Sequence, residues 1–156
     1  MFNNITKMSA IALTMISMNV NSADISVGTG RDFTQDKTSL NLSVSQSVGP
    51  VQVVGELEYF YDKSFSRLRN DQYRFSISAK KDFYKIEKVK FYTKSGLSFI
   101  DNENRPDGYA FFAGLGLEYP LTKNTSFVTE VKRQFGQDRV EMYNGNTISG
   151  GLKFTF

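Results

Sequence analysis

Hydrophobic and polar residues alternate along most of the chain with a period of two. In Ser39–Val48, the leucines and valines fall on one face, and the serines and Asn41 fall on the other. This alternation is typical of a β-strand with one apolar and one polar face. No segment shows a convincing helical period. The pattern predicts eight strands, at residues 24–33, 39–48, 51–61, 73–81, 89–100, 109–119, 126–135 and 147–156.

The connections between these strands alternate in length and character. Those after the second, fourth and sixth strands are short, at residues 49–50, 82–88 and 121–125. Those after the first, third, fifth and seventh are mostly longer and more polar, at residues 34–38, 62–72, 101–108 and 136–146. Short turns at one end and longer loops at the other are typical of bacterial outer-membrane barrels. The predicted fold is therefore all-β: an eight-stranded antiparallel up-and-down transmembrane β-barrel.

The N-terminal segment predicts export from the cytoplasm. Lys7 precedes an uncharged, mostly apolar run, Met8–Val20, and small residues come after it. This order is typical of a secretory signal peptide, and the run is shorter than the roughly 20 apolar residues of a membrane-spanning helix. We expect a signal peptide over residues 1–23, cleaved after Ser22 or Ala23, and a barrel over residues 24–156. A buried amphipathic first helix is the alternative.

The two faces of the predicted strands differ in charge. The apolar face carries two charges, Arg31 and Arg133. The polar face carries six acids (Asp24, Asp32, Glu56, Glu58, Glu118 and Glu130) and six bases (Arg74, Lys80, Lys90, Lys94, Lys132 and Lys153). Charges enclosed in a barrel need partners, because an unpaired one costs several kcal/mol. Equal numbers therefore predict a salt-bridged lumen, and the strand register places Lys90 beside Glu118.

A soluble lipocalin-like barrel would alternate in the same way, with its apolar face turned inward. The aromatic residues of the apolar face favour a membrane barrel, because they cluster toward the strand ends as interfacial belts do. One group lies toward the loops (Phe33, Tyr59, Tyr61, Tyr73, Phe99, Tyr109 and Phe135) and another toward the turns (Phe91, Tyr119, Phe127, Phe154 and Phe156). Strands of about ten residues also suit a tilted crossing of the bilayer.

Composition excludes several kinds of chemistry. The chain has no Cys, so disulfides, thiolate metal sites and Cys nucleophiles are absent, and it has no His, the commonest general base. Its formal charge of +3 is too small to indicate nucleic-acid binding. We therefore expect no cofactor and no nucleic-acid partner.

Two segments resemble a known family. The end of the chain, Gly150–Phe156, alternates apolar residues and finishes on Phe, like the C-terminal signal of bacterial outer-membrane proteins. Gly114–Leu121 (GLGLEYPL) is similar to a strand common in small barrels of the OmpA/OmpX and opacity-protein type. The resemblance implies that Leu152, Phe154 and Phe156 are read by the barrel-insertion machinery. Barrel enzymes of this size use His with Ser or an acid, so the lack of His predicts a non-enzymatic protein.

Three further groups of residues could carry chemistry. Glu56 and Glu58 share a strand face and could act as paired carboxylates on a glycoside, but a lumen ion network explains them better. Asp101, Glu103 and Asp107 could hold Ca²⁺, although a solvated loop is the simpler interpretation. Arg31 and Arg133 could contact lipopolysaccharide phosphates, or they could simply extend their charged ends to the membrane surface.

The sequence thus predicts a non-enzymatic outer-membrane barrel with a charge-plugged lumen. It would support the envelope, or present loops 62–72, 101–108 and 136–146 to an external partner that the sequence does not identify. Its surroundings would be outer-membrane lipid and lipopolysaccharide. A narrow pore for small ions or solutes is the alternative, and a soluble ligand-binding barrel is the second.

Overall fold

Eight β-strands make up most of the part of the chain that the structure describes. The computed structural model describes residues 23–61, 72–102, 108–136 and 144–156. The strands are β1 (Ala23–Asp32), β2 (Lys37–Val48), β3 (Val51–Tyr61), β4 (Gln72–Ile86), β5 (Val89–Asn102), β6 (Gly108–Pro120), β7 (Thr125–Gly136) and β8 (Gly145–Thr155). Among these residues, no helix is long and apolar enough to cross a membrane.

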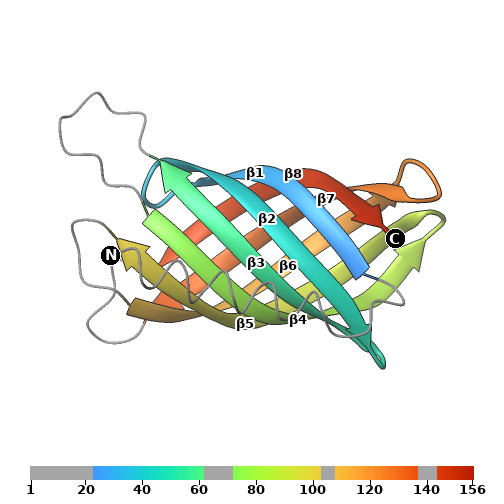
Figure 1. The fold of residues 1–156 in the computed structure, drawn as a ribbon, viewed down its shortest axis with the longest axis horizontal. Helices are drawn as coiled ribbons and strands as arrows, with labels where there is room; N and C mark the ends of the chain where they lie inside the picture. The colour runs from blue at the N-terminus through green and yellow to red at the C-terminus, as the bar shows by residue number, and fades with distance from the viewer. Residues whose placement is uncertain (1–22, 62–71, 103–107, 137–143) are drawn as a thin grey trace.

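The strands form one closed antiparallel barrel in chain order (Figure 1). Each strand pairs with its neighbours in sequence, and β8 returns to pair with β1. Backbone hydrogen bonds extend this last seam at both ends, from Phe33 N to Asn146 O at 3.0 Å and from Phe156 N to Ala23 O at 3.2 Å. The predicted fold class, an eight-stranded up-and-down barrel, is confirmed.

Most strand limits agree with the sequence pattern to within two residues, but β4 does not. The residues from Asp82 to Ile86, predicted as part of a turn, continue β4 and pair with β5. The register shifts between Asp82 and Tyr84, so the alternation of apolar and polar residues slips by one at this bulge. This slip hides the strand from a period-two pattern. The turn itself is Glu87-Lys88.

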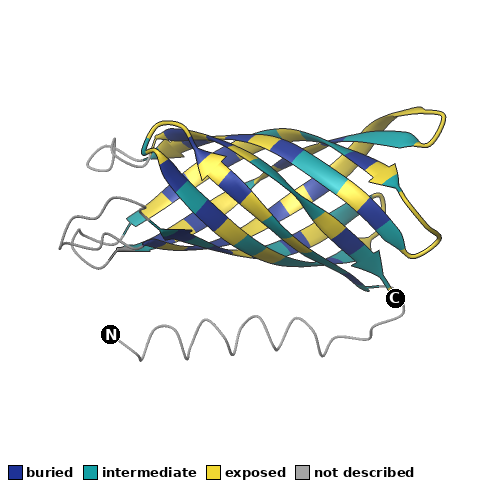
Figure 2. Ribbon diagram, turned by 90° about the horizontal axis from the view of Figure 1, so that it is seen from above, coloured by how far each residue is buried: buried dark blue, intermediate teal, exposed yellow. Residues whose placement is uncertain are grey.

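The barrel is apolar outside and polar inside. Along each strand, exposed and buried residues alternate, as Figure 2 shows. Leu40 is 55% exposed and Leu115 61%, whereas Ser39 and Phe112, on the other face of the same strands, are fully buried. A soluble barrel would have the opposite arrangement, so the lipocalin-like alternative is wrong. An exterior this apolar needs a bilayer around it.

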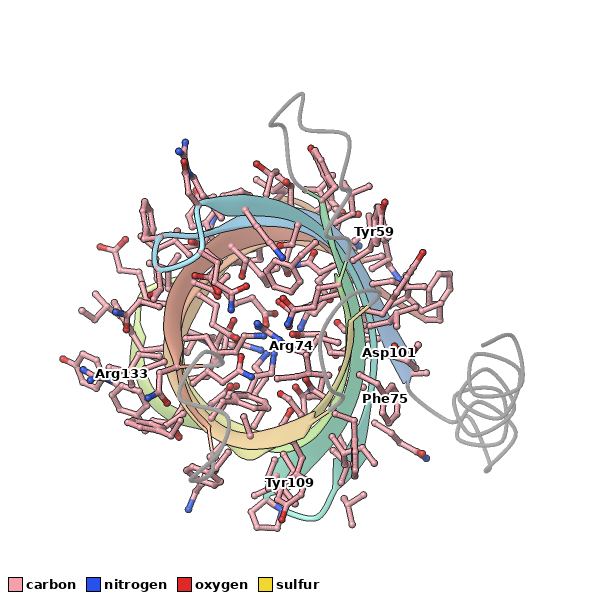
Figure 3. The ribbon with its side chains drawn as sticks, turned by 90° about the vertical axis from the view of Figure 1, so that its left-hand side faces the viewer. Tyr59, Arg74, Phe75, Asp101, Tyr109 and Arg133 are labelled. Atoms are coloured by element: carbon pink, nitrogen blue, oxygen red, sulfur yellow. The ribbon has the colours of Figure 1, made fainter. Side chains whose placement is uncertain are left out.

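The inner wall has two unequal halves. Strands β1 and β2 turn mainly small residues inward, among them Ser26, Gly28, Ser43 and Ser45. Strands β3 to β7 supply most of the long side chains, which extend across the lumen. Figure 3 shows Arg74 in the centre of the ring, with other side chains around it. Long charged side chains therefore have room to reach partners on distant strands.

Candidate functional site in the barrel lumen

The lumen is occupied by a run of ion pairs that begins near the loop end. The Arg74 guanidinium, on β4, lies 3.4 Å from Glu58 of β3 and 3.9 Å from Asp32 of β1. Its Cζ stands 4.3 Å from the centre of the Phe60 ring, which supports the cation from one side. The Lys132 ammonium, on β7, lies 2.7 Å from Glu58 Oε2, the oxygen that also faces Arg74. All five side chains are almost fully buried.

The run continues through the middle of the barrel with alternating signs. Lys132 donates a second hydrogen bond of 2.7 Å to Glu56 of β3. Lys94 of β5 then lies between Glu56, at 2.5 Å, and Glu130 of β7, at 3.2 Å. The Tyr92 hydroxyl donates a hydrogen bond of 3.2 Å to the other oxygen of Glu130. Glu56 and Glu130, the two carboxylates in the middle of the barrel, therefore each have at least one cationic neighbour.

A second group of charges lies toward the turn end. Glu118 of β6 accepts a hydrogen bond from Lys80 at 3.1 Å and is paired with Lys153 at 2.5 Å. Lys153 also lies 3.5 Å from Asp24 of β1. The Lys80 ammonium stands 4.1 Å from the centre of the Tyr92 ring. Tyr92 therefore links the two groups, by its hydroxyl on one side and by its ring on the other.

The predicted network is buried with one exception. Lys90 is the register partner of Glu118, as expected, but it is half-exposed and makes none of the ion pairs. Lys90 lies next to the start of β5, beside the turn, so Lys80 and Lys153 reach Glu118 instead. Lys37 is a buried base that the sequence pattern did not include. It was missed because β2 begins at Lys37, two residues before the predicted start of the strand. The described lumen still holds six buried acids and six buried bases.

Several neutral lumen residues are not distinguished by the sequence pattern. Phe112 is fully buried, with Lys132 at 5.1 Å and Lys94 at 5.9 Å from its ring centre. Gln72 and Gln134 are buried near the loop end, and both carry side-chain atoms without a hydrogen-bond partner. Their strand positions alternate with outward residues, so period two could have placed them inside.

A small cavity lies between the wall of small residues and the charged side chains. Its volume is about 70 Å³, enough for a few water molecules. Its lining includes Ser43 and Ser45 on one side, and Glu56, Lys80 and Tyr92 on the other. Charged side chains and this hydrated space therefore lie side by side in the lumen.

The two arginines of the apolar face lie on either side of β8, near the loop end. Arg31 of β1 is the register partner of Ile148, and Ile148 pairs on its other side with β7, which carries Arg133. Arg31 is exposed and is paired with Asp36 of the first turn. Arg133 points outward in Figure 3, with its guanidinium 5.4 Å from the Phe135 ring centre.

Other charged and aromatic residues also lie on the outer face of the barrel. Lys81 and Asp101 also lie at outward positions, near the two ends of the barrel. The sequence pattern assigned neither charge to the apolar face. Tyr59 and Tyr109 lie outside the ring in Figure 3, at the loop end. The side chains of the C-terminal signal are also outward: Leu152, Phe154 and Phe156.

Two further candidate groups from the sequence are a pair of glutamates in the lumen and the acidic residues of loop 101–108. Glu56 and Glu58 are both paired with Lys132 and buried inside the barrel, so the pair has no open face for a sugar. Within the described ranges, no three acidic side chains approach closely enough to hold a metal ion. Glu103 and Asp107 lie outside the described residues, as do residues 62–71, residues 137–143 and residues 1–22 of the predicted signal peptide.

No protein-family model matches the sequence, and no curated protein matches it. Several solved structures share its fold. The N-terminal β-barrel domain of Pseudomonas aeruginosa OprF is 18% identical, with a TM-score of 0.68, over 87% of this chain and 98% of that one. Neisserial surface protein A is 15% identical, with a TM-score of 0.67, over 86% and 95%.

Two further structures widen the range of activities found on this fold. Ail, the attachment invasion locus protein of Yersinia pestis, is 16% identical, with a TM-score of 0.59, over 86% of this chain and 98% of that one. The outer membrane enzyme PagL is 14% identical, with a TM-score of 0.52, over 85% and 98%. These likenesses concern the fold alone. The chain has the fold of the small eight-stranded outer-membrane β-barrels.

Proposed function

We propose that this protein is a non-enzymatic outer-membrane barrel with a lumen closed by charge. In this role it supports the envelope or presents its loops to an external partner. The observation that carries the proposal is the alternating run of buried ion pairs from Asp32 to Glu130, together with the second group from Lys80 to Asp24. Such a run occupies the space that a solute would need.

The ion pairs also support a mechanical role, because they join strands that are not neighbours. Lys132 connects β7 to β3, and Lys94 connects β5 to both. Lys153 connects β8 to β6. Breaking a buried pair by removing one partner typically costs about 3–5 kcal/mol. A barrel braced in this way resists flattening and is suited to a structural task in the membrane.

The absence of His supports the non-enzymatic assignment. The described lumen carboxylates are already paired with bases, which leaves them poorly placed to exchange protons with a substrate. The likeness to an outer membrane enzyme means that the fold itself permits catalysis, so the assignment rests on the residues.

Single-channel recording in a planar bilayer tests the closed lumen. We expect the folded protein to give no stable open level under moderate voltage. A reproducible open level would replace the proposal with its alternative, a narrow pore for small ions. The cavity of about 70 Å³ is the observation that favours this alternative, because a chain of water beside the small-residue wall could carry ions.

We also propose that Arg31 and Arg133 hold phosphate groups of lipopolysaccharide. Two exposed guanidinium groups on either side of β8 suit an anionic lipid at the loop end, because arginine binds phosphate through paired hydrogen bonds. Arg31→Gln with Arg133→Gln should weaken lipopolysaccharide association with the folded barrel, whereas Lys123→Gln at the other end should not. Unchanged association in the double variant would contradict this contact.

We propose, from the resemblance of the C-terminal segment, that the barrel-insertion machinery recognises Leu152, Phe154 and Phe156. In the folded barrel Leu152 and Phe154 face outward on β8, and Phe156 directly follows it; the two edges of β8 are occupied by β1 and β7. The machinery would therefore read the strand before the barrel closes. Replacing Phe156 should slow assembly in cells without changing the stability of the assembled barrel.

A further inference from the structure

The hairpin of β4 and β5 extends beyond its surroundings at the turn end. The pairing of β4 with β3 ends at Lys80 opposite Gln52. From Lys81 to Ile86, β4 continues with β5 as its partner and leaves one edge open. The hairpin is yellow-green at the right-hand end of Figure 1. All residues from Lys81 to Lys88 are exposed.

Large apolar side chains are concentrated on this extension. Phe83, Tyr84 and Ile86 are 59%, 58% and 49% exposed. The rings of Tyr84 and Phe91 are 6.1 Å apart, so the two strands share one aromatic surface. Tyr84 and Phe91 are register partners, and Phe91 lies on the outward face of β5. This aromatic surface is therefore continuous with the face of the barrel that meets lipid.

Basic residues surround the aromatic surface. From residue 81 to residue 90 the hairpin contains four lysines, Lys81, Lys85, Lys88 and Lys90, against Asp82 and Glu87. Aromatic residues beside lysines are suited to the boundary of a bilayer, where rings enter the headgroup region and ammonium groups meet phosphate. An excess of lysine favours binding to an anionic membrane surface. Each lysine near such a surface strengthens binding of the hairpin about fivefold.

The open edge of β4 could instead accept a strand from a protein partner. Two features of the hairpin oppose this use. The bulge between Asp82 and Tyr84 interrupts the regular backbone along which an added strand would pair, and lysines line the extension. Bulges and lysines are the means by which proteins prevent edge pairing. The observations therefore favour a lipid surface.

We propose that the β4–β5 hairpin, residues 81–90, binds anionic phospholipid headgroups of the leaflet at the turn end. Phe83 and Tyr84 enter the headgroup region of that leaflet, and the lysines hold its phosphates. This contact fixes the depth and tilt of the barrel on the side away from the loops. It is independent of whether the lumen conducts.

The chain has no tryptophan, so one introduced indole reports on the hairpin without background. Phe83→Trp is refolded into vesicles of phosphatidylcholine, with or without phosphatidylglycerol, and quenching by lipids brominated along the acyl chain is measured. Both leaflets contain the same lipids, so the direction of insertion does not matter. With phosphatidylglycerol, we expect emission at shorter wavelength and stronger quenching. Tyr84→Trp serves as a second reporter if the first variant does not fold.

Charge variants in the same background identify the contact. Lys81→Gln, Lys85→Gln and Lys88→Gln together should remove the gain from phosphatidylglycerol, and Lys85→Gln alone should reduce it severalfold. The matched control is Lys123→Gln in the exposed β6–β7 turn, which should leave the signal unchanged. Emission typical of an indole in water, in both kinds of vesicle, would overturn the proposal. Equal effects of the Lys85 and Lys123 variants would also overturn it, because they would indicate a general attraction.

Discussion

Lys132 connects two carboxylates of β3 at the centre of the lumen. Its ammonium lies 2.7 Å from both Glu56 and Glu58, and its exposure is only 3%. A charge in this position is stabilised only by its partners, because water does not reach it. The carboxylates depend on the lysine in the same way. The stability of this ion-pair network is therefore concentrated in a few side chains.

Lys132→Met keeps an unbranched side chain, one atom shorter, and removes the charge, so Glu56 and Glu58 lose a shared partner. We expect the barrel to lose about 3–5 kcal/mol of stability, the usual cost of breaking a buried pair. Urea unfolding in lipid vesicles measures the change. Arg133→Gln is the matched control: it removes a positive charge from the next residue, which points outward, and should cost no more than about 0.5 kcal/mol in phospholipid alone. Similar losses in the two variants would contradict the assignment.

At the scale of the strand, prediction from the sequence succeeds where apolar and polar residues alternate and fails where the alternation stops. β3 is found over the predicted residues, and the register of β5 and β6 places Lys90 opposite Glu118 as expected. The end of β4 could not be found, because one bulged residue reverses the two faces. Register brings Arg74 beside its ion-pair partner Glu58, but most other ion-pair partners lie on strands that are not neighbours and could not be found. They depend on how far a side chain extends across the lumen, and strand register does not determine that distance.

Gly96 shows how closely two strands approach in this wall. A Cβ atom at Gly96 would collide with the backbone oxygen of Ile77 and with Ser78 on β4. The obstacle includes backbone, so the strain cannot be relieved by a change of rotamer alone.

We expect Gly96→Ala to cost about 1–3 kcal/mol, as overpacking of a dense interior does. Urea unfolding in vesicles measures this change as well. At Gly150 an added Cβ would meet Val128 O at 3.7 Å, an ordinary contact, so Gly150→Ala is the control and should be nearly neutral. If both variants unfold at the same urea concentration as the parent, β4 and β5 are less closely packed than described.

For the whole molecule, sequence alternation could establish two faces but not which of them is inside. The belts of aromatic residues indicated the answer, and the burial of six acids and six bases agrees with it. A closed barrel with this interior should resist dodecyl sulfate until it is boiled. We expect the unboiled protein to migrate differently from the boiled one on a gel. Identical migration, together with solubility in plain buffer, would contradict the membrane fold.

The proposed closure of the lumen as a whole depends on the side chains that line its cavity. Tyr92 lines the cavity and also joins the two groups of ion pairs, through Glu130 and Lys80. Tyr92→Ser removes the ring and enlarges the hydrated space without adding or removing charge. We expect this variant to show brief conducting events in planar bilayers, whereas the parent shows none. Phe99→Ser, at an exposed outward position of the same strand, is the control and should remain silent. If Tyr92→Ser is also silent while still folded, the ion pairs close the lumen without the ring, and the plug extends along its full length.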